Sequence, residues 1–229
     1  MIVFGKKVAK EVIDSNITIK KAILSTNFND DKILKYLNDN NVRIEYMDKN
    51  KMDYKYNGNH QGIVIDIPDY KYHDIEEVYN SSFVIILDHL EDPHNFGAII
   101  RTCEASGVDF IIVPKNRSIE INSTVMKVSA GALNNMKIVQ VNNINNAIEK
   151  LKENGFWIYA TDMDGECYTD VKYDDKTAII VGNEGSGISR LAREKSDFVI
   201  SIPMKGKINS LNASVATAIV IYEVVRQRK

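Results

Sequence analysis

The sequence predicts an α/β protein that combines a C-terminal parallel-sheet domain with a small N-terminal α/β domain. Short, continuous apolar runs recur through the second half of the chain, which is typical of strands buried on both faces of a parallel sheet. Segments with helical spacing lie between most of these runs. The polar, tyrosine-rich stretch "DYKYHDIEEVYNSS" separates the halves, so we expect domains at 1–70 and 83–229 joined by a linker at 71–82.

The N-terminal elements follow from residue spacing. "VAKEVIDS" has the spacing of a helix, and "ITIKKAILS" is rich in the β-branched residues of a strand. "DDKILKYLND" predicts a helix opened by Asp30 or Asp31. "VRIEYM" predicts a second strand, and "HQGIVIDIPDY" contains a third that Pro68 stops.

The C-terminal domain should contain six strands. They are expected at Phe83–Leu87, Phe110–Val113, Lys137–Val141, Trp157–Thr161, Ala178–Val181 and Phe198–Ile202. Helices are expected to begin near Asn95, Ser123, Ile144, Ile188 and Leu211. Ligands of such sheets bind in loops beyond the carboxyl ends of the strands, so these loops are the candidates for a site.

Composition and charge exclude several classes of protein. The chain has 229 residues, 44% hydrophobic and 26% charged, as in soluble globular proteins. Its net charge of −2 gives no global field for nucleic acid, although a local basic patch can sit on such a surface. Cys103 and Cys167 lack CxxC spacing, so neither a disulfide scaffold nor a zinc site is expected and a reducing cytoplasm is favoured. We find no signal peptide, and the longest apolar stretch, Ala216–Tyr222, is too short for a membrane span.

The first candidate loop follows the strand Phe83–Leu87 and reads "DHLEDPHNFGAIIRT". Proline keeps Asp92 out of the helical region and forces a turn, and Asn95 is a good helix cap. Arg101 follows six residues later and can point near the helix entrance. A capped helix with a surface arginine would give the same pattern.

The second loop, "IIVGNEGSGISR", joins a buried strand to a helix through a glycine-rich turn. Its GxxGxG spacing differs from a dinucleotide loop, and the Gly-Lys-Ser/Thr of a P-loop is missing. The turn presents backbone groups and holds Glu184 at its tip, where a helix dipole favours a carboxylate. The alternative is an ordinary turn that only connects the strand to the helix.

The third loop, "MKGKIN", follows the strand Phe198–Ile202 and runs into "SLNASVA". Ser210 is a natural N-cap for the helix. Asn212 would then be the second helical residue, where capping does not explain an asparagine.

Together, "DHLEDPHNFGAIIRT", "VGNEGSGISR" and "SIPMKGKINSLNASVATAIVIYEVVRQR" resemble the three ordered motifs of the SPOUT superfamily of knotted RNA methyltransferases, in its TrmH-type ribose 2′-O-methyltransferase branch. The resemblance covers about Val84 to Arg228. "IVFGKKVAKEVI" and "NHQGIVIDI" are similar to the small RNA-binding domain of enzymes that methylate a guanosine of 23S ribosomal RNA.

The resemblance implies a deep trefoil knot near the C-terminal end, an exception to un-knotted topology. It implies S-adenosylmethionine (AdoMet) as methyl donor, held by backbone groups of Gly182, Ile202 and Leu211. It also implies a homodimer with the last helix at its interface and an RNA partner. No membrane association is expected. No metal is expected either, because a sulfonium is already a good leaving group.

The family's site residues carry over motif by motif. Arg101 would bind the target phosphate beside the 2′-hydroxyl, with action as the base left open because a guanidinium normally stays charged. The residues that orient this arginine, the ribose and the phosphate would be Asn95, Glu184, Ser210 and Asn212. Basic residues expected to grip RNA are Lys6, Lys7, Lys10, Lys20, Lys21, Arg190, Arg193, Lys205 and Lys207.

Three alternatives stay open. A tRNA ribose methyltransferase or another ribosomal RNA 2′-O-methyltransferase would share the catalytic half. A non-catalytic RNA-binding or ribosome-assembly protein belongs to a different class, and AdoMet titration would separate it from an enzyme.

Overall fold

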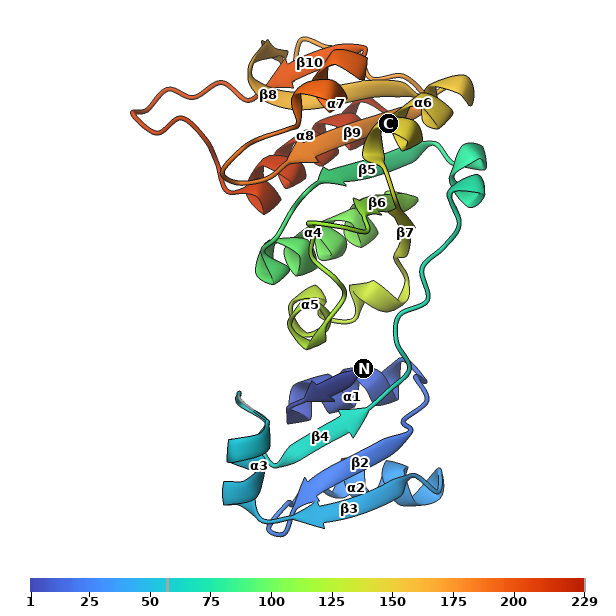
Figure 1. Cartoon of the computed structure of the whole chain (residues 1–229), viewed down its shortest axis with the longest axis vertical. Coiled ribbons are helices and arrows are strands. Elements are labelled where there is room, and N and C mark those ends of the chain that lie inside the picture. The colour runs from blue at the N-terminus through green and yellow to red at the C-terminus, as the bar shows by residue number, and fades with distance from the viewer. Residues whose placement is uncertain (57, 229) are drawn as a thin grey trace. The chain divides into compact units, whose positions relative to one another are not determined.

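The computed structural model of the chain describes residues 1–56 and 58–228, which divide into two compact units (Figure 1). The N-terminal unit comprises Met1–Lys71 and Ile121–Asn134, and the C-terminal unit comprises Tyr72–Glu120 and the chain from Asn135 onward. Lys229, the last residue of the expected second domain, lies outside the described residues. The segment Ile121–Asn134 was expected in the second domain, whereas its contacts group it with the first.

The N-terminal unit contains a four-stranded sheet in the part of the chain that the structure describes. Its order is β1 (Ile2–Phe4), β4 (Ile63–Asp66), β2 (Lys21–Ser25) and β3 (Arg43–Met47). Its helices are α1 (Lys6–Asp14), α2 (Asp31–Asp39), α3 (Lys49–Lys55) and α5 (Ser123–Ser129). Strand β2 runs parallel to β3 and antiparallel to β4. The α2 helix begins after Asp30, which accepts the N–H of Ile33 and decides between the two expected caps.

Two elements of this unit, β1 and α3, were missing from the sequence-based expectation. Strand β1 has three residues, and α3 has only Met52 buried, so neither shows a periodicity to detect. Met52 packs with Ile23 and Val64, which attaches α3 to one face of the sheet. A single buried side chain therefore positions a helix whose other side chains face solvent.

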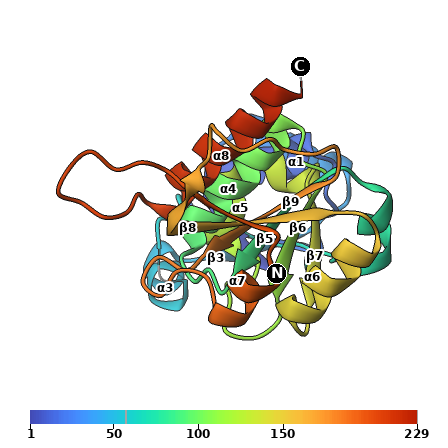
Figure 2. The same cartoon turned by 90° about the horizontal axis from the view of Figure 1, so that it is seen from above.

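The C-terminal unit confirms the six expected strands, and their sheet is wholly parallel within the described residues. Its order is β10 (Phe198–Ser201), β8 (Trp157–Cys167), β9 (Thr177–Gly182), β5 (Phe83–Asp88), β6 (Phe110–Pro114) and β7 (Lys137–Val141). Helices α4 (Pro93–Ser106) and α8 (Ala213–Gln227) cover one face, and α6 (Ile144–Glu153) and α7 (Arg190–Lys195) cover the other (Figure 2). Strands β5 and β6 are buried along their whole length because both faces are covered.

Strand β8 is longer than expected because it bends around a glycine. Its pairing with β10 shifts between Val199 and Ile200, so Ile200 lies opposite Glu166. A Cβ on Gly165 would lie 2.6 Å from the backbone of Ile200, which leaves room only for glycine. The expected helical turn before the sheet is a 3-10 helix at Ile75–Asn80, and His73 beside it pairs with Val139 of the edge strand β7.

Parallel pairing places the carboxyl ends of β5, β9 and β10 at one edge of the sheet. The three loops that the sequence marked as candidates leave from this edge. In the region that the structure describes, the helices are too short or too polar to cross a lipid bilayer.

Candidate active site

Asn95 links the three candidate loops. Its Nδ2 donates a hydrogen bond of 2.6 Å to Glu184 Oε1, and its Oδ1 accepts one of 2.9 Å from Asn212 Nδ2. The partners lie 89 and 117 residues away in sequence. Asn95 is only 6% exposed, so both polar ends of a buried amide are satisfied by the other two motifs.

The expectation that Asn95 caps its helix was wrong. Helix α4 begins two residues earlier at Pro93, and Asp92 is the cap, accepting the N–H of His94 at 2.9 Å. Proline is favoured at the first helical position because its φ is already helical and its missing N–H needs no partner. Asn95 therefore lies inside the first turn, where its side chain is available for the other loops.

The interpretation of the third motif is reversed. Helix α8 begins at Ala213, and the cap is Asn212, whose Oδ1 accepts the N–H groups of Ser214 at 3.0 Å and Val215 at 3.4 Å. Ser210 lies outside the helix and is exposed. Asn212 therefore uses its oxygen to cap α8 and its amide nitrogen to hold Asn95, so one side chain serves both roles.

A second link joins the first two loops, through residues that sequence reasoning did not place in the site. Asp88, buried at the end of β5, accepts the N–H of Ser189 at 2.7 Å, and its other oxygen lies 2.5 Å from Nδ1 of His89. Asn183 Nδ2 donates to the backbone oxygen of His89 at 2.9 Å. A carboxylate at the last position of a buried strand was the available sequence signal.

The glycine turn is held closed by its own backbone. Asn183 and Gly187 exchange two backbone hydrogen bonds of 3.0 and 2.9 Å. A Cβ on Gly182 would lie 2.2–2.5 Å from backbone atoms of Gly187 and Ile188, so no side chain fits there. Gly187 adopts φ +68°, in the left-handed region that glycine enters without strain. The turn presents Glu184 at its exposed tip, as expected, with the carboxylate on Asn95.

Arg101 and Ser210 are not joined to this cluster. Six helical residues advance about 9 Å along the axis, so Arg101 lies well beyond Asn95 on α4. Its side chain is exposed and makes no hydrogen bond or ion pair within the described part of the chain. The structure therefore brings together three of the five expected catalytic residues and leaves two facing solvent.

The expected cofactor residues fit a ligand with a flat apolar ring. Ile202 is half-buried and Leu211 is 37% exposed at the two ends of the loop after β10. Met204 and Ile208 on the same loop are 38% and 72% exposed, so apolar side chains stand uncovered along it. Figure 1 shows this loop, at the red end of the colour range, reaching away from the sheet. An adenine ring would cover such side chains and bond to backbone N–H and C=O groups.

Many of the basic side chains expected to bind RNA already have partners within this chain. Lys6 donates to the backbone oxygen of Asn29, and Lys10 and Lys21 form ion pairs of 2.9 and 2.6 Å with Asp30 and Glu45. In the C-terminal unit, Arg190 pairs with Glu194, and Arg193 pairs with Asp162 and Asp164. Lys7, Lys20, Lys205 and Lys207 remain exposed. The described residues contain no cluster of three or more His, Cys, Asp or Glu side chains arranged to hold a metal ion.

Two family models match the chain, one for each part. Residues 82–222 match the SpoU rRNA methylase family, and residues 2–73 match a model described as RNA 2′-O ribose methyltransferase substrate binding. A protein of Staphylococcus saprophyticus assigned to the TrmH family of tRNA/rRNA methyltransferases is 41% identical, covering 100% of this chain and 96% of its own. A Staphylococcus aureus protein of the same description is 39% identical over 99% of this chain and 96% of its own.

Solved structures share the fold. The SpoU methyltransferase AviRb from Streptomyces viridochromogenes, in complex with the cofactor AdoMet, superposes with a TM-score of 0.80 at 23% identity, covering 100% of this chain and 90% of that one. The A. aeolicus TrmH/SpoU tRNA modifying enzyme is 34% identical with a TM-score of 0.60, covering 67% of this chain and 80% of that one.

A parallel sheet whose three motif loops meet at its carboxyl edge, preceded by a substrate-binding unit, defines an RNA methyltransferase. The chain belongs to the SpoU rRNA methylase family. This membership confirms the enzyme class that the three motifs predicted.

Proposed function

We propose that the protein transfers a methyl group from AdoMet to a ribose 2′-hydroxyl of ribosomal RNA, with a guanosine of 23S ribosomal RNA as the target. The observation that carries the proposal is the bridge from Glu184 through Asn95 to Asn212. These are three residues to which the family motifs give an orienting role, and they come from three different loops. Their junction marks the place where cofactor, ribose and phosphate would meet.

The lengths of the structural matches favour ribosomal RNA over tRNA. The rRNA methyltransferase of Sinorhizobium meliloti covers 98% of this chain, with a TM-score of 0.80. The A. aeolicus tRNA modifying enzyme and a second structure described as methylating tRNA cover 67% and 64%. This chain carries an N-terminal unit, and its residues 2–73 match the substrate-binding family model.

Bound AdoMet would supply a methyl group on a positively charged sulfur, which is a good leaving group without a metal. Backbone groups of Gly182, Ile202 and Leu211 would hold this cofactor, with glycine at the first position because a Cβ has no space there. The chain must then align the ribose hydroxyl and receive or release its proton.

Arg101 is the residue proposed to meet the RNA backbone. Its exposed guanidinium has no partner among the described residues, so its five donors are free for a phosphate, which the planar fork can bind bidentately. Fixing the phosphate places the neighbouring 2′-hydroxyl. Action as the base would require a neutral guanidine, so phosphate binding is its first role.

We propose the domain roles and the homodimer that the resemblance implied. Residues 1–70 would bind RNA, 71–82 would link the domains, and 83–229 would form the knotted catalytic domain. A homodimer is supported by the half-exposed apolar stripe of Val215, Ile219 and Tyr222 on α8, which the chain itself leaves uncovered. Cys103 and Cys167 are free thiols, which suits a reducing cytoplasm.

The Arg101→Ala variant tests the assignment. We expect methyl transfer to ribosomal RNA to be lost, with AdoMet binding unchanged by calorimetry, because the arginine lies outside the hydrogen-bonded loops. Glu104→Ala, an exposed change on the same helix, is the matched control and should keep its activity. Methylation by the Arg101 variant at the wild-type rate would contradict the role.

The target is tested by mapping 2′-O-methyl sites with and without the gene. A site lost from 23S ribosomal RNA supports the proposal, and a site lost only from tRNA rejects it. A wild-type protein that binds RNA and fails to bind AdoMet would favour the non-catalytic alternative.

A further inference from the structure

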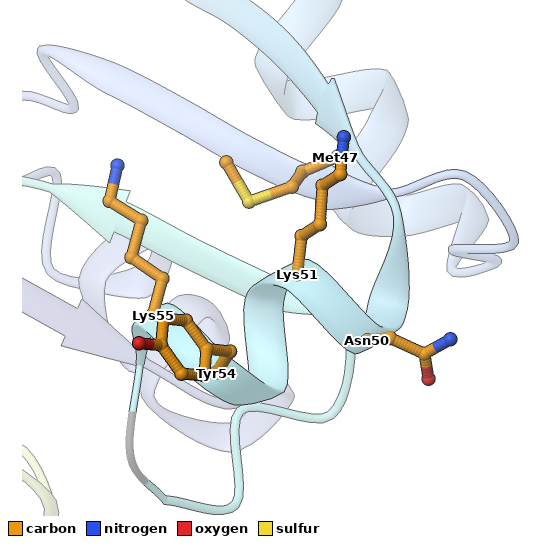
Figure 3. Close-up of a pocket in the computed structure, with 5 residues that line it drawn as sticks. All are labelled: Met47, Asn50, Lys51, Tyr54 and Lys55. Carbon is orange, nitrogen blue, oxygen red and sulfur yellow. The ribbon is translucent and has the colours of Figure 1, made fainter.

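The N-terminal unit carries a surface hollow that no part of the proposed mechanism uses (Figure 3). Five residues from the end of β3 and from α3 line it: Met47, Asn50, Lys51, Tyr54 and Lys55. Figure 3 shows Lys51 and Lys55 extending in the same direction on either side of the Met47 side chain, with the Tyr54 ring beside Lys55. The hollow therefore has an apolar lining of thioether, aromatic ring and lysine stems, with two ammonium groups at its rim.

Packing does not explain this arrangement. Met52 alone of the α3 side chains is buried, whereas Tyr54 is 95% exposed. Its ring adds nothing to the buried core, and its apolar face stays open to solvent. Tyr54 is therefore available to a ligand rather than to the core.

The charge of α3 is positive and uncompensated toward solvent. Its acidic residue, Asp53, is hydrogen-bonded to the buried ring of His60 at 2.7 Å. Lys51 forms no ion pair within the described residues, and Lys55 lies 5.3 Å from the ring of Tyr56. In contrast, Lys10 and Lys21, which the sequence offered as RNA contacts, are paired with carboxylates. Lys51 and Lys55 thus place two positive charges at the hollow, in addition to the exposed Lys7 and Lys20 of the same unit.

We propose that this hollow binds one unstacked nucleotide of the RNA substrate, away from the methylated ribose. A nucleobase would stack on the Tyr54 ring against the Met47 thioether, and Lys51 and Lys55 would meet the flanking phosphates. Aromatic stacking beside a positive rim is how proteins hold single-stranded nucleic acid without reading its sequence. The inference rests on the proposed function, because it takes RNA as the substrate.

The test uses the full-length protein and a fluorescein-labelled single-stranded RNA of twelve mixed nucleotides at low salt, with the matching duplex alongside. Tyr54→Ala should weaken binding of the single strand about tenfold, the loss of one stacked base. Tyr54→Phe should bind like wild type because the ring is kept. The double variant Lys51→Ala, Lys55→Ala should weaken binding and reduce the slope against salt by up to about 2.

Matched controls come from the other face of the unit. Tyr46 is 65% exposed and alternates away from Met47 on β3, and Lys32 and Lys35 are exposed on α2. Tyr46→Ala and the double change of those lysines should leave binding unchanged. Each variant should unfold at the wild-type temperature because the changed side chains are exposed.

The outcomes separate the two proposals. The hollow is not a nucleotide site if the Tyr54→Ala and double-lysine variants bind the single strand like wild type, if duplex binds more tightly than single strand, or if wild type binds no single strand. A wild-type protein that transfers no methyl group to a ribose 2′-hydroxyl would instead reject the proposed function. We expect AdoMet affinity of Tyr54→Ala to equal that of wild type, since the hollow and the cofactor loops belong to different units.

Discussion

Replacing Asn95 by aspartate changes one atom of the bridge and keeps its shape. The Asn212 amide keeps its acceptor, because the aspartate still offers an oxygen at that position. The Asn95 Nδ2 atom, which lies 2.6 Å from Glu184 Oε1 in the wild-type protein, is replaced by a second carboxylate oxygen. The substitution therefore converts a charge-assisted hydrogen bond into a contact between like charges.

The magnitude is set by the exposure of Glu184. At an effective dielectric constant of about 20, two unit charges this close repel by about 6 kcal/mol. Glu184 is exposed and can turn into water, so most of this repulsion is relieved. The remaining loss is the hydrogen bond to a charged acceptor, about 1.5–3 kcal/mol. For a chain of this size that lowers the melting temperature by about 5–10 °C.

The loss of folding stability caused by Asn95→Asp should depend on pH. The introduced carboxyl binds its proton more tightly beside Glu184 in the folded protein than in the unfolded chain. Its protonated form therefore adds stability at low pH, and this stability disappears as the pH rises. We expect a deficit relative to wild type that is largest at pH 8 and smaller near pH 5, where a proton can restore the hydrogen bond.

The assay is thermal unfolding of wild type and variant at both pH values. Asn135→Asp is the matched control, because Asn135 Nδ2 also donates to a carboxylate, Glu104, at 3.1 Å, with both residues exposed. That change should cost less than about 0.5 kcal/mol. Equal losses for the two variants, or a deficit independent of pH, would refute the claim that a buried Asn95 joins the motifs.

Three further predictions test the loops. Gly182→Ala should lower AdoMet affinity more than tenfold by calorimetry, because its Cβ would lie 2.2–2.5 Å from backbone, whereas Gly185→Ala meets its nearest atom at 3.5 Å and should bind normally. Asn212→Ala should destabilise the protein by about 1–2 kcal/mol in denaturant unfolding through loss of a helix cap. Ser210→Ala should leave that free energy unchanged, and equal losses would show that the cap is misassigned. Asp88→Asn should cost about 1–3 kcal/mol, because the amide replaces one of the two carboxylate oxygens that contact Ser189 and His89 and removes the negative charge, and a melting temperature equal to wild type would contradict this link.

Local sequence was sufficient to predict an element wherever the chemistry of its own residues restricts the backbone. The central strands β5, β6 and β9 were predicted because each is a short apolar run that can be stable only when covered on both faces. Such a run carries its signal within a few residues. By contrast, α3 escaped detection because one buried side chain makes no pattern.

The caps show where local reasoning stopped. The sequence favoured Asn95 and Ser210 as the caps of two helices, although aspartate, asparagine and serine have nearly equal capping propensity. The structure selects Asp92 and Asn212. Asn95 is thereby left free to bond the cap of a helix 117 residues later.

The sequence by itself determined the fold class, the three loops and the residue types in them, because these depend on apolar periodicity, on glycine and proline geometry and on short motifs. Only the tertiary structure decided which polar side chains meet. Parallel pairing brings the carboxyl ends of strands that are distant in sequence to one edge of the sheet. The hydrogen bonds that Asn95 donates to Glu184 and accepts from Asn212, and the one that Ser189 donates to Asp88, exist only after that assembly.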